Sequence, residues 1–234
     1  MEEIFPSYYH EIKNIKKIVG FFGSVGNDRL ISFLSRKECQ KLEKIEFLKH
    51  KNIDLNYLTT KSLTNLSLLK NLVIDTCDVV NIEPLRMLKK LVYLECPRNQ
   101  ITSLEPLRKL KDLEYLGFSY NYVTSLEPLS SLTKIQHLSF EKNNVSSLIP
   151  LISLCNLRWI SVGRCKFKSW KGVPENVNYL VLENYYEYWY VLENIKELSG
   201  TSKFRLIKEI LEKKEISWIS WINIFDLNKL YDFF

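Results

Sequence analysis

The stretch TSLEPL occupies residues 102–107 and recurs unchanged at residues 124–129, 22 positions further along the chain. Sequence repeats of this length are typical of solenoid proteins. Rows of 22 residues extend the match from residue 68 to residue 155, and a row two residues shorter continues it to residue 175. The row at 112–133, which reads DLEYLGFSYNYVTSLEPLSSLT, shows the pattern in full. We therefore expect a stack of similar structural units.

The apolar residues of each row predict a strand followed by a buried turn. In the row at 112–133, Leu116 and Phe118 are two positions apart, so their side chains point the same way from a strand. The apolar set of that row is completed by Leu113, Val123, Leu126, Leu129 and Leu132. One row cannot bury these side chains alone, whereas stacked rows bury them in one continuous core.

A polar position follows each strand. Asn99, Asn121 and Asn143 recur there every 22 residues. A buried amide side chain at such a place can satisfy the backbone groups of the turn, which would otherwise lack hydrogen-bond partners. Cys77 and Cys165 take the same place in the outer rows, and we predict a structural role for both.

Four prolines mark the other side of each row. Each of them precedes a Leu-x-x-Leu segment, at Pro84, Pro106, Pro128 and Pro150. Proline is accepted at the start of a helix because its missing N–H has no partner there. Each row is therefore predicted to end with one short helical turn. Strands on one side and bulkier turns on the other force the stack to curve, with the sheet on the concave side.

The consensus LxxLxLxxNxIxxLxPLxxL resembles the leucine-rich repeats of the 22-residue class, which bacterial internalins share with a regulatory subunit of a protein phosphatase. The resemblance covers residues 41–185. It implies an α/β fold, namely a curved leucine-rich-repeat solenoid with a concave parallel β-sheet and short helical or 3-10 turns on the convex side. It also implies a protein–protein interaction module or scaffold. Members of the family often tolerate cysteine at the asparagine position.

The two flanks do not follow the repeat. Residues 1–40 and 186–234 carry apolar side chains at helical spacing, and we predict helical caps that cover the open ends of the core. An adapter motif resembling an F-box is a weaker alternative for the first flank, which lacks a convincing leucine-proline signature. The alternative for the second is a helix that docks on a partner or on a membrane surface, because it contains Trp218, Trp221, Ile222 and Phe225.

Composition points to an intracellular protein. The opening MEEIFPSYYHEI is not a secretory signal, and no stretch reaches the roughly 18 apolar residues of a spanning helix. The five cysteines are odd in number and have no CxxC spacing, so a reducing compartment is expected. The expected location is the cytoplasm, or the host cytoplasm or the virion if the chain is viral.

Catalytic signatures are missing from the sequence. The three histidines, His10, His50 and His137, belong to no HExxH motif or metal-spaced cluster, and no GxSxG segment occurs. A GxxGxxG run at Gly20, Gly23 and Gly26 lacks the Lys-Ser/Thr of a phosphate-binding loop, so a turn explains it better. We predict no enzyme activity, no catalytic residue, no cofactor and no metal site.

Residues that alternate with the core leucines must face outward from the concave sheet. One outward column contains five ring residues, Tyr93, Tyr115, His137, Trp159 and Tyr179. The next column is mostly small, which is expected to leave the rings accessible. A column nearer the loops contains Arg98, Tyr120, Lys142 and Arg164.

Aromatic and arginine side chains supply interface hot spots, so these nine residues are the predicted partner-binding site. The alternative is that the rings only stack along the strands and stabilise the sheet. The leading functional hypothesis is a non-enzymatic module that binds a protein partner of unknown identity. Nucleic-acid binding is a second hypothesis, because rings next to Arg and Lys can hold bases and phosphates and the net charge is +6. A structural role in a larger assembly is a third.

Overall fold

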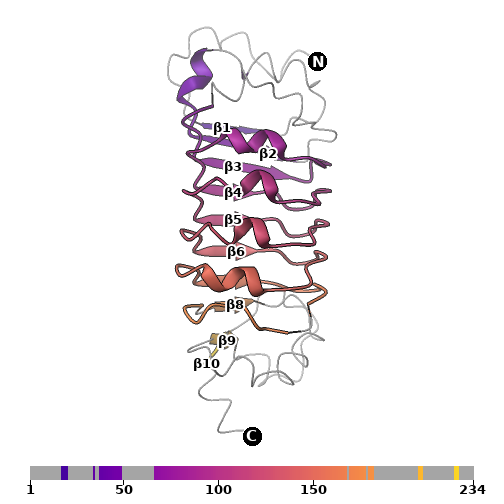
Figure 1. Cartoon of the computed structure of the whole chain (residues 1–234). Coiled ribbons are helices and arrows are strands. Elements are labelled where there is room, and N and C mark those ends of the chain that lie inside the picture. Colours follow the sequence, from indigo (N-terminus) through magenta and orange to yellow (C-terminus); the bar gives the residue numbers. More distant parts are fainter. Residues whose placement is uncertain are drawn as a thin grey trace, which may run out of the picture.

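The computed structural model of the chain describes the backbone at residues 17–20, 34, 37–48, 66–167, 169–177, 179–181, 205–207 and 224–226, and side chains at 34, 39–46, 66–167 and 169–177. Within this part the chain winds into a stack of rows, each with one strand on the same side (Figure 1). The predicted leucine-rich-repeat solenoid is confirmed.

The strands form one sheet in which sequence order equals spatial order. Neighbouring strands pair in parallel from β1 to β9, and β10 pairs antiparallel with β9. Their bounds are Lys17–Gly20 (β1), Lys44–Leu48 (β2), Asn71–Asp75 (β3), Tyr93–Glu95 (β4), Tyr115–Gly117 (β5), His137–Ser139 (β6), Trp159–Ser161 (β7), Tyr179–Val181 (β8), Arg205–Ile207 (β9) and Ile224–Asp226 (β10). From β3 to β7 each residue pairs in parallel with the residue 22 positions further along the chain, as Asn71 does with Tyr93, so equivalent residues of successive rows lie side by side.

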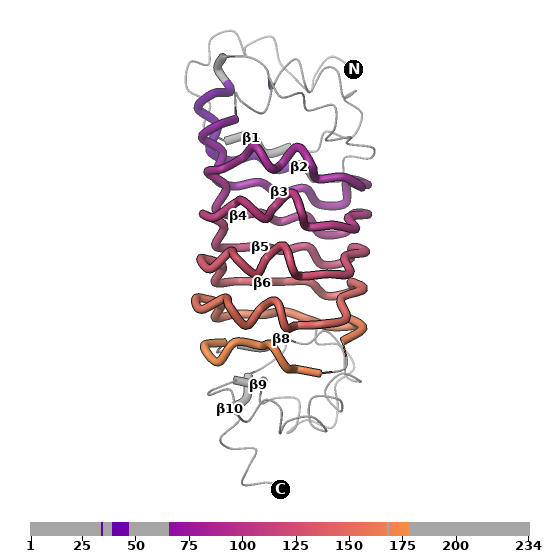
Figure 2. The backbone as a smooth tube through the Cα atoms, viewed as in Figure 1, coloured from indigo at the N-terminus to yellow at the C-terminus, as the bar shows by residue number. Residues whose placement is uncertain are grey.

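Short 3-10 helices form the opposite side of the rows, and Figure 2 shows one such winding in each of the central rows. They span Lys37–Lys41 (η2), Glu83–Met87 (η4), Glu105–Leu107 (η5), Glu127–Leu129 (η6) and Ile149–Ser153 (η7). In η4 to η7 the proline is the second residue rather than the first. The predicted helical turn is therefore confirmed, with proline one position further in.

The serine of the recurring TSLEPL segment makes a local hydrogen bond. The Ser103 hydroxyl accepts a hydrogen bond from the backbone N–H of Glu105 at 3.2 Å, and Ser125 accepts one from Glu127 at the same distance. A serine in this position supplies an acceptor for an N–H at the start of a helix, which has no partner within the helix. Serine and proline thus both favour the start of the turn.

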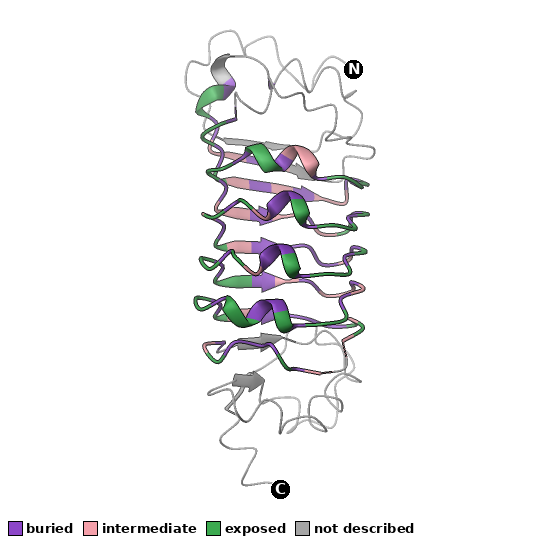
Figure 3. Ribbon diagram, viewed as in Figure 1, coloured by how far each residue is buried: buried purple, intermediate pink, exposed green. Residues whose placement is uncertain are grey.

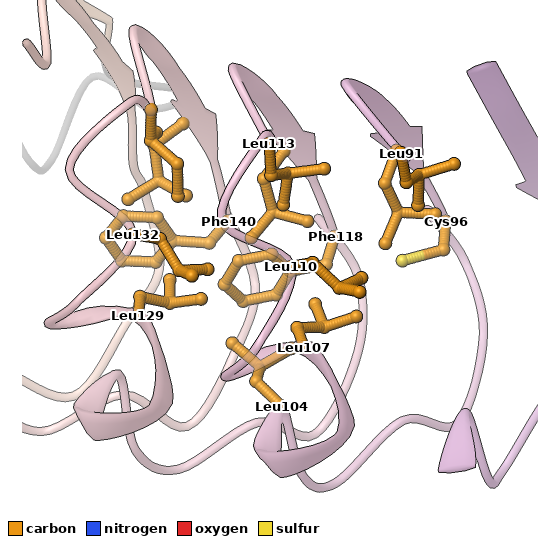
Figure 4. Close-up of a cluster of buried hydrophobic side chains, with 14 of the residues drawn as sticks. Leu91, Cys96, Leu104, Leu107, Leu110, Leu113, Phe118, Leu129, Leu132 and Phe140 are labelled. Carbon is orange, nitrogen blue, oxygen red and sulfur yellow. The ribbon is translucent and has the colours of Figure 1, made fainter. Parts of the chain in front are cut away.

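The core lies between the sheet and the turns, and buried residues recur on the strand and on the turn of successive rows (Figure 3). Phe118 and Phe140 are fully buried in adjacent rows and stack with ring centroids 5.8 Å apart. Figure 4 shows these two rings among leucines of the rows, including Leu107 of η5 and Leu129 of η6. The predicted continuous core is confirmed.

The asparagines bind the turns of successive rows together. Asn121 Nδ2 donates to the carbonyl of Phe118 in its own row at 2.9 Å and to the carbonyl of Cys96 in the preceding row at 3.0 Å. Its Oδ1 accepts from the N–H of Ile101 at 2.9 Å. In the row at 156–175, the Cys165 thiol takes over the contact with the preceding row and lies 3.4 Å from the Phe140 carbonyl. The predicted structural role of the position agrees with these contacts.

The predicted helical caps at 1–40 and 186–234 fall mostly outside the described residues, as do Trp218, Trp221 and Ile222. Within these flanks the structure describes the strands β1, β9 and β10 and the 3-10 helix η2, so the predicted helical structure is not found in the three strand segments. Among the residues that the structure describes, no helix is long and apolar enough to cross a membrane.

Candidate interaction surface

Four rings form a continuous row across strands β4 to β7. Parallel register aligns Tyr93, Tyr115, His137 and Trp159 at the start of successive strands. The centroids of Tyr93 and Tyr115 are 4.2 Å apart at an interplanar angle of 13°. The next two pairs are 5.9 Å and 6.0 Å apart, at 26° and 39°. We call these four residues the aromatic ladder. Tyr179 continues the register beside Trp159, but its side chain lies outside the described residues.

Stacking changes which part of each ring meets solvent. Tyr93, Tyr115 and Trp159 are half-buried, and only His137 is exposed. The rings are thus less accessible than the small neighbouring column had suggested, because they cover one another's faces along the sheet. What they present outward is largely ring edge. The edge of an aromatic ring carries partial positive charge, whereas its face carries partial negative charge.

Two acidic residues on the same face are engaged by hydroxyl donors. The Tyr93 hydroxyl donates to Glu95 Oε2 at 2.6 Å. Burial and the hydrogen bond to this carboxylate raise the pKa of Tyr93 well above its usual range, so the ladder keeps its phenol protonated. Glu141 accepts hydrogen bonds from the hydroxyls of Ser119 and Ser161, which belong to the rows on either side of it.

A second row of side chains borders the sheet on its loop side. It consists of Arg98, Tyr120, Lys142 and Arg164, each directly before the asparagine or cysteine of its turn. We call this row the cationic edge. The Lys142 ammonium lies 4.1 Å from the Tyr120 ring centroid, and the Arg98 guanidinium carbon lies 5.3 Å from it. Cations at these distances are attracted by the face of an aromatic ring.

All four residues of the cationic edge have left-handed backbones, with φ of 53° at Arg98, 60° at Tyr120, 50° at Lys142 and 50° at Arg164. The N–H groups of Arg98, Tyr120 and Lys142 nevertheless continue the sheet pairing, as in the bond from Tyr120 N to the Glu141 carbonyl at 2.7 Å. Sequence reasoning missed this conformation because glycine, asparagine and aspartate are the residues that usually adopt it. The signal in the sequence that could have indicated a shared backbone conformation is the recurrence of these residues directly before the asparagine or cysteine of each row.

The structure therefore brings eight of the nine predicted site residues onto two neighbouring rows of one surface, while the side chain of Tyr179 is not described. Their role in binding stays a prediction. Among the described residues, no group of three or more His, Cys, Asp or Glu side chains is arranged to hold a metal ion.

Comparison with known proteins decides the type of repeat. The family described as "Leucine Rich repeats (2 copies)" matches residues 89–131. The chain contains leucine-rich repeats. This match spans η5 and η6 together with β4 and β5, so it includes both copies of TSLEPL.

Two crystal structures from Listeria monocytogenes share the leucine-rich-repeat fold. Internalin C2 is 24% identical with a TM-score of 0.57, and the alignment covers 72% of this chain and 80% of that one. The internalin inlF is 19% identical with a TM-score of 0.56, and the alignment covers 85% of this chain but only 62% of that one. Identities this low show the fold alone. No curated protein sequence matches the chain.

Proposed function

We propose that this leucine-rich-repeat chain is a non-enzymatic interaction module that binds a protein partner on its concave sheet. The observation that carries the proposal is the aromatic ladder, an unbroken row of rings on the solvent-facing side of β4 to β7. Ring residues and arginine are enriched where interfaces concentrate their binding energy. We further propose an intracellular location, on the strength of composition alone.

Nucleic-acid binding is less well supported by the geometry. Bases bind sequence-tolerantly by stacking on open aromatic faces. Within the ladder the ring faces are turned toward neighbouring rings, and at Tyr120 the ring lies between the cations of the two adjacent rows. Two carboxylates, Glu95 and Glu141, also lie on the surface that a phosphate backbone would have to cross.

The experiment is an affinity capture from the native cell, with the bound proteins identified by mass spectrometry. The bait is the full chain, beside a Tyr115→Ser/Trp159→Ser double variant and an Ile152→Ser control. Ile152 is 68% exposed on η7, away from the strands, so the control removes an exposed apolar side chain from the other surface. Circular dichroism and thermal melting establish that all three baits fold.

A protein captured by the wild type and the control, but lost in the double variant, supports the proposal. A partner that survives the double variant and is lost in the control places the site on the turns and contradicts it. Material that disappears after nuclease treatment supports nucleic-acid binding instead. Capture of many copies of one assembly protein supports the structural role.

A further inference from the structure

The edge of the solenoid at which the strands begin is made of two-residue turn tips. Each tip lies between two apolar residues whose backbones share one hydrogen bond, as from the Leu91 N–H to the Leu88 carbonyl at 3.1 Å. The next row repeats this bond 22 positions further on, from Leu113 to Leu110 at 3.2 Å. The tips of successive rows are therefore equivalent positions, and their side chains point away from the core.

Positive charge gathers at the tips of two adjacent rows. Lys89 and Lys90 form one tip, Lys111 begins the next tip, and Lys109 lies two residues before it. All four side chains are exposed, and we call them the lysine patch. The equivalent tip at 155–156 reads Cys-Asn, so the leucine-rich repeat does not itself require lysine at this place.

Acidic residues on the turns beside the lysine patch are bound to other cations. They form three ion pairs, namely Glu83–Arg86 at 2.7 Å, Glu105–Arg108 at 2.5 Å and Asp112–Lys134 at 2.6 Å. Lys111 Nζ donates to the hydroxyl and the carbonyl of Ser131, at 2.7 Å and 3.1 Å, and these neutral acceptors leave its charge uncompensated. In the part of the chain that the structure describes, no lysine of the patch is in an ion pair.

The cations of the lysine patch repel one another. Partial burial lowers the pKa of Lys89, and the nearby charges of Lys109 and Arg86 lower it further. The chain's own carboxylates thus do not neutralise this part of the surface. A negatively charged ligand over the patch would relieve the repulsion, so the patch selects for anions.

Two exposed apolar side chains lie among the lysines. Leu68 occupies the tip of the preceding row, at the position equivalent to Lys90, and Met87 at the end of η4 is equivalent to Lys109. Leu68 is 45% exposed and Met87 is 42% exposed. Apolar side chains next to lysines match the interface of an anionic membrane, where apolar groups enter the headgroup–acyl boundary and ammonium groups stay among the headgroups.

The choice of lysine favours a fluid array of anions over a fixed one. An ammonium is a point charge on a flexible stem, whereas the planar guanidinium suits a fixed carboxylate. The arginines of these turns, Arg86 and Arg108, already bind the chain's own glutamates. Lysine is depleted at protein–protein interfaces, and the segments 86–90 and 108–112 contain no ring on which a nucleic-acid base could stack. Lipid headgroups diffuse in the membrane plane, so they can gather around mobile ammonium groups.

We propose that the lysine patch docks the chain on an anionic phospholipid surface, with its four lysines among the headgroups and with Leu68 and Met87 at the boundary of the acyl chains. This inference goes beyond the proposed function and does not rest on it, because the lysine patch lies on the turns, outside the strands that carry the aromatic ladder.

The test is cosedimentation of the folded full chain with vesicles of phosphatidylcholine, either alone or with about 30% phosphatidylserine, at low and high salt. Three variants are compared with the wild type: a patch variant (Lys89→Gln/Lys90→Gln/Lys109→Gln/Lys111→Gln), an apolar variant (Leu68→Ser/Met87→Ser) and a control (Arg98→Gln/Lys142→Gln/Arg164→Gln/Lys166→Gln). The control makes the same change in net charge as the patch variant, but at and beside the cationic edge, where the strands end. Circular dichroism establishes that every variant folds.

We expect the wild type to bind the vesicles that contain phosphatidylserine and to ignore those of phosphatidylcholine alone. One lysine close to an anionic surface contributes about fivefold in binding, so the patch variant should bind at least about fiftyfold more weakly. The control should stay within about threefold, because salt screens charges on the opposite edge. The apolar variant should bind several-fold more weakly with an unchanged dependence on salt, since it keeps all the lysines.

Three results overturn the inference: a patch variant that binds as tightly as the wild type, a control that loses as much binding as the patch variant, and an apolar variant with unchanged affinity. Equal binding of the wild type to the two kinds of vesicle overturns it as well. Polyglutamate and a single-stranded oligonucleotide serve as competing polyanions. If the wild type binds either of them more tightly than the vesicles, the patch belongs to an acidic protein or to a nucleic acid instead of a membrane.

These measurements are separate from the test of the proposed function. None of the vesicle variants changes Tyr115 or Trp159, and the capture experiment leaves the lysine patch intact. Failure of vesicle binding therefore removes only the membrane surface, whereas failure of the capture experiment removes only the protein partner of the concave sheet.

Discussion

The ring of Tyr115 stacks on the ring of Tyr93 at a centroid distance of 4.2 Å, although the two residues are separated by 22 positions in the chain. Parallel register produces this contact, because Tyr93 and Tyr115 are backbone partners in β4 and β5. The same register gives Tyr115 a second ring neighbour, His137. The aromatic ladder is thus both a candidate binding surface and part of what holds the rows together.

Replacing Tyr115 with leucine should therefore cost stability. Two ring contacts are lost, and aromatic pairs contribute about 0.5–1.5 kcal/mol each beyond buried area, so we expect unfolding to become easier by about 1–2 kcal/mol. Urea denaturation followed by circular dichroism measures the change. Tyr122→Leu is the matched control, because Tyr122 is 56% exposed on the neighbouring turn and should tolerate the change within about 0.5 kcal/mol. Equal losses in the two variants would show that ring stacking contributes nothing specific.

The asparagine position supplies a second prediction. Asn121→Ala removes the acceptor for the Ile101 N–H, which leaves this buried donor without that partner, and removes one of two donors to the Cys96 carbonyl, which keeps its hydrogen bond from Asn99. A buried group without a partner costs about 1–3 kcal/mol, and a loss of that size is expected in thermal or urea unfolding.

Asn121→Cys tests the same position with a side chain that the protein itself uses there. Cys165 still reaches the carbonyl of the preceding row, so Asn121→Cys should lose less stability than Asn121→Ala. Gln100→Ala, at an exposed position of the same kind of turn, should be nearly neutral. If the cysteine variant is no better than the alanine variant, the contact with the preceding row is not what stabilises the turn.

How far the sequence predicts this structure depends on whether a residue's neighbours are fixed by the repeat. The strand position of Leu116, the buried position of Phe118 and the contacts of Asn121 follow from the repeat, because each depends only on equivalent parts of a neighbouring row. The aromatic ladder was predictable for the same reason, since residues 22 positions apart lie side by side on neighbouring strands.

Other features depend on details that a repeat pattern does not contain. The left-handed backbones of Arg98 and Lys142 arise from turn hydrogen bonds that override the preference of these residue types. The hydrogen bonds of Glu141 to serines of two other rows depend on side-chain rotamers. Residue type and spacing therefore predicted which residues lie on the candidate surface. Its left-handed backbones and the hydrogen bonds between its side chains are visible only in the three-dimensional structure.

The short row at 156–175 supplies a third prediction, at Gly172. This glycine has φ of +108°, and a Cβ there would lie 2.4 Å from the backbone carbonyl atoms of Leu148. Gly172→Ala should therefore destabilise the chain by about 3 kcal/mol, from strain of roughly 1–3 kcal/mol together with the displaced backbone. Gly117→Ala is the control, because its nearest atoms, in Glu95 and Tyr115, are at an ordinary 3.4 Å. The measurement compares the urea midpoints of the two alanine variants. A Gly172→Ala chain as stable as Gly117→Ala would contradict the close approach of Gly172 to the Leu148 backbone.

The last prediction concerns alkaline pH and the buried thiol of Cys96. Burial, together with the nearby Glu95 carboxylate, raises the pKa of Cys96 to about 12. In the unfolded chain a thiol loses its proton near pH 8.5. The stability contributed by the protonated thiol is therefore fully present below about pH 8.5 and is lost as pH rises toward about 12, because the unfolded state binds fewer protons in that window.

Between pH 8 and pH 10.5 the wild type should thus lose about 2 kcal/mol more unfolding free energy than Cys96→Val, which keeps the apolar volume and cannot ionise. Cys155→Val is the control, since it removes an exposed thiol in place of a buried one. Urea denaturation of the three proteins across this range gives the slopes, and the tyrosines and lysines common to all of them cancel in the comparison. A Cys96→Val chain with the same slope as the wild type would mean that the thiol reaches solvent before the chain unfolds.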